Sequence, residues 1–162
     1  MALILDGTTG ASAVQVGAVT TAKLPAGTVL QVVNAAYSTA TSSSTNTAVT
    51  TGLTATITPT SASSKILVLV NQAGVKKSNN TYAALYLYRG ASSLIQFEGE
   101  GGYTNTTTDN TFGSCSACYL DSPATTSATT YTTYFKSVAN IASVGVQGSS
   151  AVSTITLTEI AA

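Results

Sequence analysis

The sequence contains no histidine and no tryptophan, and only one methionine and two cysteines among its 162 residues. Histidine is the commonest general base, a frequent metal ligand and the usual activator of a nucleophilic serine or cysteine. Without histidine, most known arrangements of catalytic residues cannot be built. We therefore expect a protein that is not an enzyme and that holds no cofactor or metal.

Charge is also scarce, with six basic and six acidic residues that cancel. A neutral chain offers no basic field to nucleic acid, so nucleic acid is excluded as a partner. The first apolar run, ALIL before Asp6, has no basic segment ahead of it and is too short for a signal peptide or a membrane span. We expect synthesis in the cytoplasm and no membrane partner.

Threonine and serine are abundant and supply 50 residues, 30 of them threonine. Threonine is β-branched and favours strands over helices. From residue 28 onward, short strand patterns alternate with clusters of Gly, Asn, Ser and Pro. The sequence predicts an all-β fold, a β-sandwich or jelly roll of about eight antiparallel strands spanning residues 28–162.

Two segments define the expected faces of these strands. In residues 48–59, Leu53, Ala55 and Ile57 alternate with threonines, which predicts a half-buried strand. The segment KILVLV, residues 65–70, is apolar on both faces. It suits a central strand that is covered on two sides, or one whose outer face meets another subunit.

The first 27 residues differ from the rest, because they carry four glycines, Pro25 and scattered aliphatic side chains without a period. Such a segment buries little against its own domain, so it is either a frayed tail or an arm that is ordered by a partner. We predict an extended N-terminal arm over residues 1–27. Its candidate anchoring side chains are Leu3, Ile4, Leu5, Val14, Val16, Val19 and Leu24.

Two motifs resemble catalytic or metal sites. Cys115 and Cys118 form a CxxC, but residues three apart on a strand point to opposite faces, so we expect a structural role. Glu98 and Glu100 could share a strand face as a glycosidase dyad or a calcium ligand pair, or form a solvated edge. We favour the solvated edge, because no aromatic platform of tryptophan and no EF-hand loop accompanies the two acids.

Further candidates lie on the surface of the predicted sandwich. Tyr82, Tyr86, Tyr88, Tyr131 and Tyr134 could stack on a sugar or pack within the protein, and we favour packing. The polar loop at residues 99–111 opens with three glycines and is a candidate receptor-binding loop. Its candidate contact residues are Tyr103, Asn105, Asp109 and Asn110. We interpret Lys76 and Lys77 as part of a polar connection between two strands, where the lysines keep the protein soluble.

The segments GLTATITPTSASSKILVLVNQ, ALYLYRG, CYLDSPATTSATTYTTYFKS and STITLTEI together resemble a family of small domains in tailed phages. The family occurs in tail-fibre and other virion structural proteins, especially those of phages that infect cyanobacteria and marine bacteria. The opening MALILDGTTG also looks like the start of such proteins. The resemblance implies a virion component with a trimeric β-sandwich, located on the capsid surface or on the tail, and it transfers no active site.

Three functions follow as hypotheses. The first is a homotrimeric capsid cement or decoration protein, anchored through residues 1–27, that bridges major capsid subunits. The second is a short tail-fibre or fibre-tip protein that recognises a host cell-surface glycan through the loop at residues 99–111. The third, a depolymerase, depends only on the pair of Glu98 and Glu100.

Overall fold

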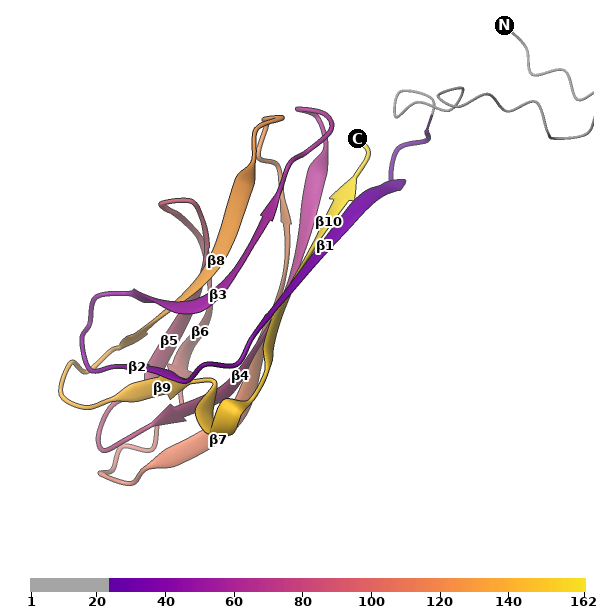
Figure 1. The fold of residues 1–162 in the computed structure, drawn as a ribbon. Helices are drawn as coiled ribbons and strands as arrows, with labels where there is room; N and C mark the ends of the chain where they lie inside the picture. The colour runs from indigo at the N-terminus through magenta and orange to yellow at the C-terminus, as the bar shows by residue number, and fades with distance from the viewer. Residues whose placement is uncertain (1–23) are drawn as a thin grey trace, which may run out of the picture.

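The computed structural model describes residues 24–162, which form ten strands and one short 3-10 helix, η3 (Gly148–Ser150) (Figure 1). The strands are β1 (Val29–Tyr37), β2 (Thr41–Ser43), β3 (Val49–Ile57), β4 (Lys65–Lys77), β5 (Ala83–Arg89), β6 (Ser92–Gly101), β7 (Asn110–Asp121), β8 (Thr129–Ser137), β9 (Val144–Val146) and β10 (Ser153–Ile160). The predicted anchoring residues Leu3, Ile4, Leu5, Val14, Val16 and Val19 lie outside the described residues.

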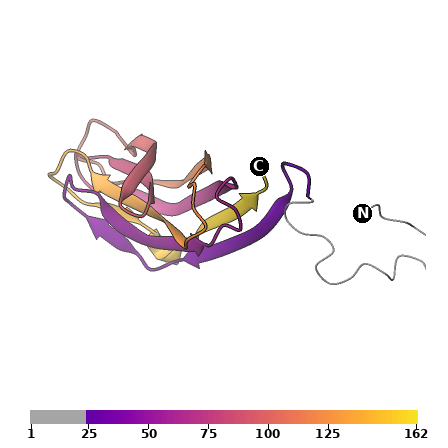
Figure 2. The same ribbon diagram turned by 90° about the horizontal axis from the view of Figure 1, so that it is seen from above.

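The strands form two antiparallel sheets that face each other (Figures 1 and 2). One sheet has the order β1-β10-β4-β9-β2, with β7 on the other edge of β4, and the second has the order β3-β8-β5-β6. This architecture confirms the predicted all-β sandwich. The two shortest strands, β2 and β9, have three residues each and pair with each other.

The core lies between the sheets and is built by period-two alternation. In β3, Leu53, Ala55 and Ile57 are buried while the intervening threonines are exposed, as predicted. Burying one such aliphatic side chain stabilises the fold by about 1.5–3 kcal/mol. The main cluster comprises Leu53, Ala55, Ile57, Ile66, Val68, Val70, Leu87, Tyr131, Ile155 and Leu157.

Strand β4 crosses the middle of the larger sheet, between β10 on one side and β7 on the other. Ile66, Val68 and Val70 point into the core. Leu67 is half-buried and Leu69 is 42% exposed, so within residues 24–162 nothing covers the outer face of this strand. The sequence allowed KILVLV to be a central strand that is covered on both faces by its own domain. Within the described residues that interpretation is wrong.

One end of the sandwich is closed by a buried carboxylate on β10. Glu159 accepts hydrogen bonds from the Thr60 backbone N–H at 2.7 Å, from Thr60 Oγ1 at 2.8 Å and from Gln31 Nε2 at 2.6 Å. Burial raises the pKa of Glu159, but the bonds from Gln31 and Thr60 outweigh burial and hold the pKa below its usual value. Glu159 thereby ties β1, β10 and the turn after β3 together.

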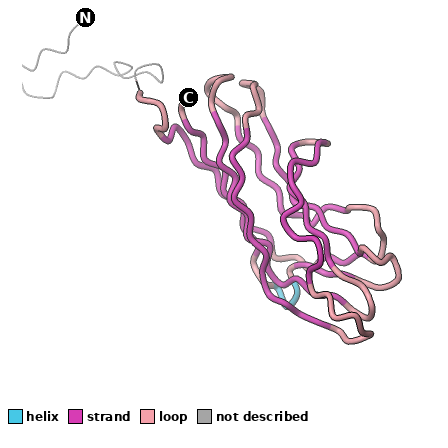
Figure 3. Tube along the Cα trace, turned by 180° about the vertical axis from the view of Figure 1, so that it is seen from behind, coloured by secondary structure: helices cyan, strands magenta, loops and turns pink. Residues whose placement is uncertain are grey.

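The two chain ends of the described region meet at this same end. Gly27 N–H donates to Ala161 O, and Ala161 N–H donates to Thr28 O, so β1 and β10 remain paired up to the C-terminus. Helix η3 lies at the opposite end of the sandwich (Figure 3). The half-buried Leu24 therefore enters the domain beside the C-terminal residues and next to β1, the edge strand of the larger sheet.

Candidate functional site

The outer face of the larger sheet carries an exposed aliphatic row. Strand register aligns Val32 with Thr158, Thr158 with Leu67, and Leu67 with Leu120, across β1, β10, β4 and β7. Val32 is 59% exposed and Leu120 is 49% exposed. We call this surface the aliphatic face, and it consists of Val29, Val32, Leu67, Leu69 and Leu120.

The threonines of β10 complete the aliphatic face. Thr156 and Thr158 lie between the aliphatic side chains of β1 and β4, and they contribute methyl groups rather than charge. Contiguous exposed apolar surface on a small protein commonly marks an interaction site. Because the row from Val32 to Leu120 carries no charge, this surface suits contact with another protein surface.

The outer face of the smaller sheet has different chemistry. Thr54 and Thr56 of β3 share hydrogen bonds with Thr132 and Thr130 of β8, at 2.9 and 2.7 Å between hydroxyl oxygens. Tyr88 is paired with Thr132, and Tyr86, Tyr134 and Tyr82 lie further along the same face. The ring of Tyr88 is 4.3 Å from that of Tyr134 and 6.4 Å from that of Tyr86, measured between centroids. This surface is polar and aromatic.

Tyr131 does not belong to that group. It is fully buried, and its hydroxyl donates to Asp121 Oδ2 at 2.7 Å. Burial and this hydrogen bond raise the pKa of Tyr131. The predicted set of five tyrosines therefore divides into one core residue and four residues on the outer face.

A hollow of about 420 Å³ opens on the aromatic surface. We call it the tyrosine hollow. Its polar side chains are Gln96 and Glu100 of β6 and Lys136 of β8. Ala84 of β5 lies between Tyr82, which directly precedes that strand, and Tyr86. The Lys136 ammonium lies 5.8 Å from the centroid of the Tyr86 ring, within the range of a cation–π interaction. The sequence did not single out Gln96 or Lys136, because only strand pairing brings them beside the tyrosines.

The polar loop between β6 and β7 spans residues 102–109, shorter than the predicted 99–111 because both strands extend further than expected. Tyr103 is 50% exposed and its ring meets that of Tyr82 edge-on at 5.4 Å. Asn105 is exposed, with a positive φ of 49°. Asp109 Oδ1 accepts from the Asn79 N–H, and Asn110 Nδ2 donates to Gly102 O. Tyr103 and Asn105 thus remain available for contact, while Asp109 and Asn110 hold the loop.

Lys77 is the residue that organises this loop, and the sequence interpretation of it was wrong. It lies within β4 rather than in a connection, and it is 2% exposed. Its ammonium donates to Asn79 O at 2.7 Å, Thr104 Oγ1 at 2.6 Å and Thr106 O at 3.3 Å. No sequence pattern indicated these bonds, because two of the acceptors are 27 and 29 residues away.

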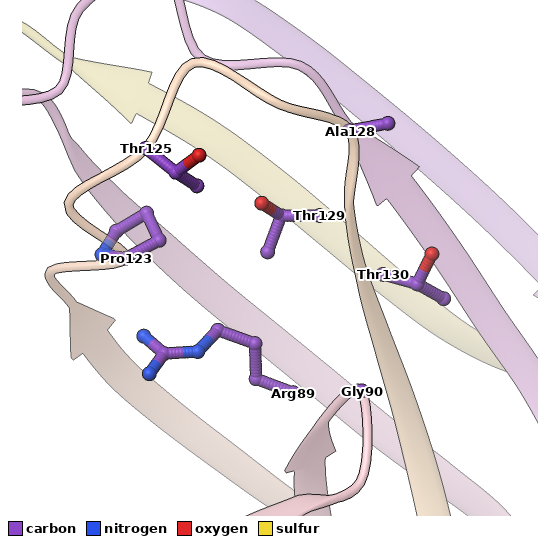
Figure 4. Close-up of a pocket in the computed structure, with 7 residues that line it drawn as sticks. All are labelled: Arg89, Gly90, Pro123, Thr125, Ala128, Thr129 and Thr130. Atoms are coloured by element: carbon purple, nitrogen blue, oxygen red, sulfur yellow. The ribbon is translucent and has the colours of Figure 1, made fainter.

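Another hollow, of about 250 Å³, lies beside Arg89 at the end of β5 (Figure 4). The Arg89 side chain extends toward Pro123, with Thr125 and Thr129 across from it. Arg89 Nη1 donates to both oxygens of Asp121, at 2.9 and 2.8 Å. The carboxylate neutralises the guanidinium, so this hollow has little attraction for an anion, and the ion pair instead joins the two sheets.

The two cysteines point to opposite sides of β7, as predicted. Cys115 is buried and Cys118 is exposed. Burial, together with the neighbouring carboxylate of Glu98 at 3.8 Å from Sγ, raises the pKa of the Cys115 thiol to about 11. A thiol with so high a pKa is a poor nucleophile near neutral pH.

The acidic pair does not form a dyad. Glu98 pairs with Leu85 and reaches Cys115 on the inner side, whereas Glu100 lines the tyrosine hollow on the outer face. A register shift between Ala83 and Leu85 separates the two acids, so the shared strand face that their spacing allowed does not form. Within residues 24–162 no three His, Cys, Asp or Glu side chains gather as metal ligands. No helix in that range is long and apolar enough to cross a membrane.

In comparisons with known proteins, the sequence matches no family and no curated protein. The resemblance to phage virion domains accordingly remains a prediction.

Proposed function

We propose that this protein is a homotrimeric cement or decoration protein on the surface of a phage capsid, where each trimer bridges neighbouring major capsid subunits. The aliphatic face is the observation that carries the proposal. It spans four adjacent strands and is uncovered within residues 24–162. Neighbouring copies of the chain are the occupants that best fit this uncharged apolar surface, because in a closed ring of three each copy buries such a face against the next copy through a heterologous contact.

The strand order supports a jelly roll within the sandwich class, and hence the virion assignment. Four of the strands form the path β1-β10-β4-β7, and the other four long strands form β3-β8-β5-β6. Along these eight strands the chain crosses between the sheets at every step except the β5–β6 hairpin, as in two interleaved Greek keys. Jelly rolls are common in capsid proteins.

The position of Leu24 supports anchoring through the arm. Leu24 precedes β1, and Val29 at the start of β1 is 55% exposed on the aliphatic face. Residues 1–23 thus join the domain at one end of that face. We propose that residues 1–27 contact the major capsid protein, with the many copies on a capsid adding to the strength of attachment.

Three measurements test the proposal. Sedimentation of the purified chain should show a trimer, and a monomer at high micromolar concentration contradicts the assembly role. Gold-labelled antibody on intact particles should mark the whole head. A chain lacking residues 1–23 should stay folded and lose capsid binding, while retained binding rejects the anchoring role.

Label confined to the tail would favour the second candidate, a short tail-fibre or fibre-tip protein that binds a host cell-surface glycan. The ordering of residues 102–109 by Lys77 supports it, because a fixed loop presents Tyr103 and Asn105 at low entropic cost. A glycan array that compares the unmodified chain with a Tyr103→Ala, Asn105→Ala variant tests this role. Equal binding by both chains would show that this loop does not contact the glycan.

A further inference from the structure

We propose that the tyrosine hollow binds a neutral saccharide, with a pyranose ring seated between Tyr82 and Tyr86. This inference does not rest on the assembly role, because the hollow lies on the sheet opposite the aliphatic face. It also differs from a loop site. The contacts come from β5, β6 and β8 rather than from Asn105 and the loop tip.

The shape of the hollow follows from the sequence Tyr-Ala-Ala-Leu-Tyr. Tyr82 and Tyr86 point to the same side and stand about 13 Å apart along the strand, at about 3.3 Å per residue. Ala84 lies between them and is only 1% exposed, so its small side chain forms the floor of the hollow of about 420 Å³. Tyrosine rings present apolar surface with a polar tip. They can therefore pack against the C–H groups of a sugar ring while its hydroxyls remain hydrogen-bonded.

The polar groups of the hollow have the complementary chemistry. Within residues 24–162 the only salt bridge joins Arg89 to Asp121, so Glu100 and Lys136 are not paired with each other. A carboxylate accepts, an ammonium donates, and the Gln96 amide does both. Each sugar hydroxyl is likewise a donor and an acceptor. The opposite charges of Glu100 and Lys136 cancel, which favours a neutral sugar over an anion.

Two further features of the hollow determine where Lys136 and Gln96 lie before a ligand binds. Lys136 is positioned over the Tyr86 ring. Gly99 makes room for Gln96, because a β-carbon at residue 99 would lie 2.6 Å from Gln96 Nε2. The backbone of Gly99 does not require glycine, since its φ is not positive. The space for the amide is therefore the clearest reason for a glycine here.

The test is a titration of the full-length, isotope-labelled chain followed by NMR. The probes are methyl β-galactopyranoside, methyl α-glucopyranoside and N-acetylglucosamine, each raised to tens of millimolar. We expect saturable shifts for at least one probe at the amides of Ala84, Gly99 and Lys136 and at the Gln96 side chain. Saturation transfer from the tyrosine rings to the sugar C–H protons should accompany them.

Three variants remove different parts of the hollow. Glu100→Gln and Lys136→Gln each delete one charged partner, and each should weaken binding about tenfold or more, as expected for a hydrogen bond to a charged group. Gly99→Ala removes no polar group and should also weaken binding, because it displaces the Gln96 amide. Lys65→Gln is the matched control. It changes an exposed lysine on the other sheet and should bind like the unmodified chain.

Several results would overturn the proposal. One is the absence of shifts with all three sugars, and another is binding that persists unchanged in Glu100→Gln, Lys136→Gln and Gly99→Ala. Shifts confined to residues 104–108 would place the sugar on the loop instead. Sedimentation of the same samples reports separately on assembly, so loss of the trimer and loss of sugar binding are distinguishable.

Discussion

The outer faces of the two sheets come from strands with the same alternating pattern, yet they differ in almost every exposed side chain. The larger sheet exposes Val32, Leu69 and Leu120, whereas the smaller sheet exposes paired threonines and a group of tyrosines. The inward side chains of both sheets form two buried clusters of aliphatic and aromatic residues, together with hydrogen-bonded polar side chains such as Glu159, Gln72 and Thr133. The inner positions thus define the fold, and the outer positions determine what each sheet contacts.

The largest effect should come from a charge placed on the aliphatic face. Leu69→Asp puts a carboxylate at the centre of the proposed contact between copies, where it would be buried without a partner. Burying an unpaired charge costs several kcal/mol. Self-association should therefore weaken about a hundredfold or more by sedimentation equilibrium. Thr130→Asp, an exposed site on the other sheet, should leave association unchanged, and equal weakening in both variants would refute the distinction between the faces.

The second prediction concerns the loop beside the aromatic surface. Lys77→Met keeps most of the side-chain length but removes three hydrogen bonds from a buried ammonium. We expect a loss of about 3 kcal/mol in the free energy of unfolding and faster amide exchange over residues 102–109. Both can be measured, by urea denaturation and by hydrogen exchange mass spectrometry.

The neighbouring lysine is the control for that experiment. Lys76 is exposed, and Lys76→Met should change stability by no more than about 0.5 kcal/mol. If the two variants are equally stable, the ammonium of Lys77 does not hold the loop. In that case the hydrogen bonds of Lys77 would not be what holds Tyr103 against Tyr82.

The third prediction concerns β10, which contributes Thr158 to the aliphatic face and Glu159 to the interior. Glu159→Gln should cost about 1–2 kcal/mol at neutral pH, because an amide cannot accept all three hydrogen bonds equally well. The folded-state pKa of Glu159 lies below its unfolded value. Its contribution is therefore fully present above the ordinary glutamate pKa of about 4.3 and is lost as the pH falls through the folded value.

Urea unfolding at a series of pH values measures this dependence. The difference in stability between the unmodified chain and Glu159→Gln should shrink as the solution becomes acidic. Glu100→Gln, which changes an exposed acid, should show a much smaller difference at every pH. A constant gap between the unmodified chain and Glu159→Gln would contradict the assigned role of the carboxylate.

Local patterns predicted the faces of single strands but not the surfaces that several strands build together. The alternation in β3 and in the tyrosine strand β5 was visible because it has a period of two. The alignment of Val32, Leu67 and Leu120 depends on register, which no local pattern specifies. The separation of Glu98 from Glu100 depends on an irregular pairing, and the burial of Lys77 depends on acceptors far away in sequence. The short strands β2 and β9 each gain their partner only in the folded sheet.

The smallest effect on stability should come from the threonine pairs of the smaller sheet. The hydroxyls of Thr56 and Thr130 bond to each other at 2.7 Å, but both are exposed and can bond to water instead. The double variant Thr56→Val, Thr130→Val should change the free energy of unfolding by no more than about 0.5 kcal/mol. By contrast, Thr51→Val leaves the buried Thr133 hydroxyl without one of its partners and should cost about 1–3 kcal/mol.

If the exposed threonine pairs contribute little to stability, their value lies in keeping this sheet from assembling. Valine has nearly the same shape as threonine, so the double variant gives the smaller sheet an exposed aliphatic row like that of the larger one. We expect this variant to associate beyond a trimer, as measured by light scattering, because the chain then has a second exposed apolar face. A variant that remains trimeric would mean that the tyrosines or the curvature of the smaller sheet already prevent contact. The hydroxyls would then have no part in restricting assembly to one face.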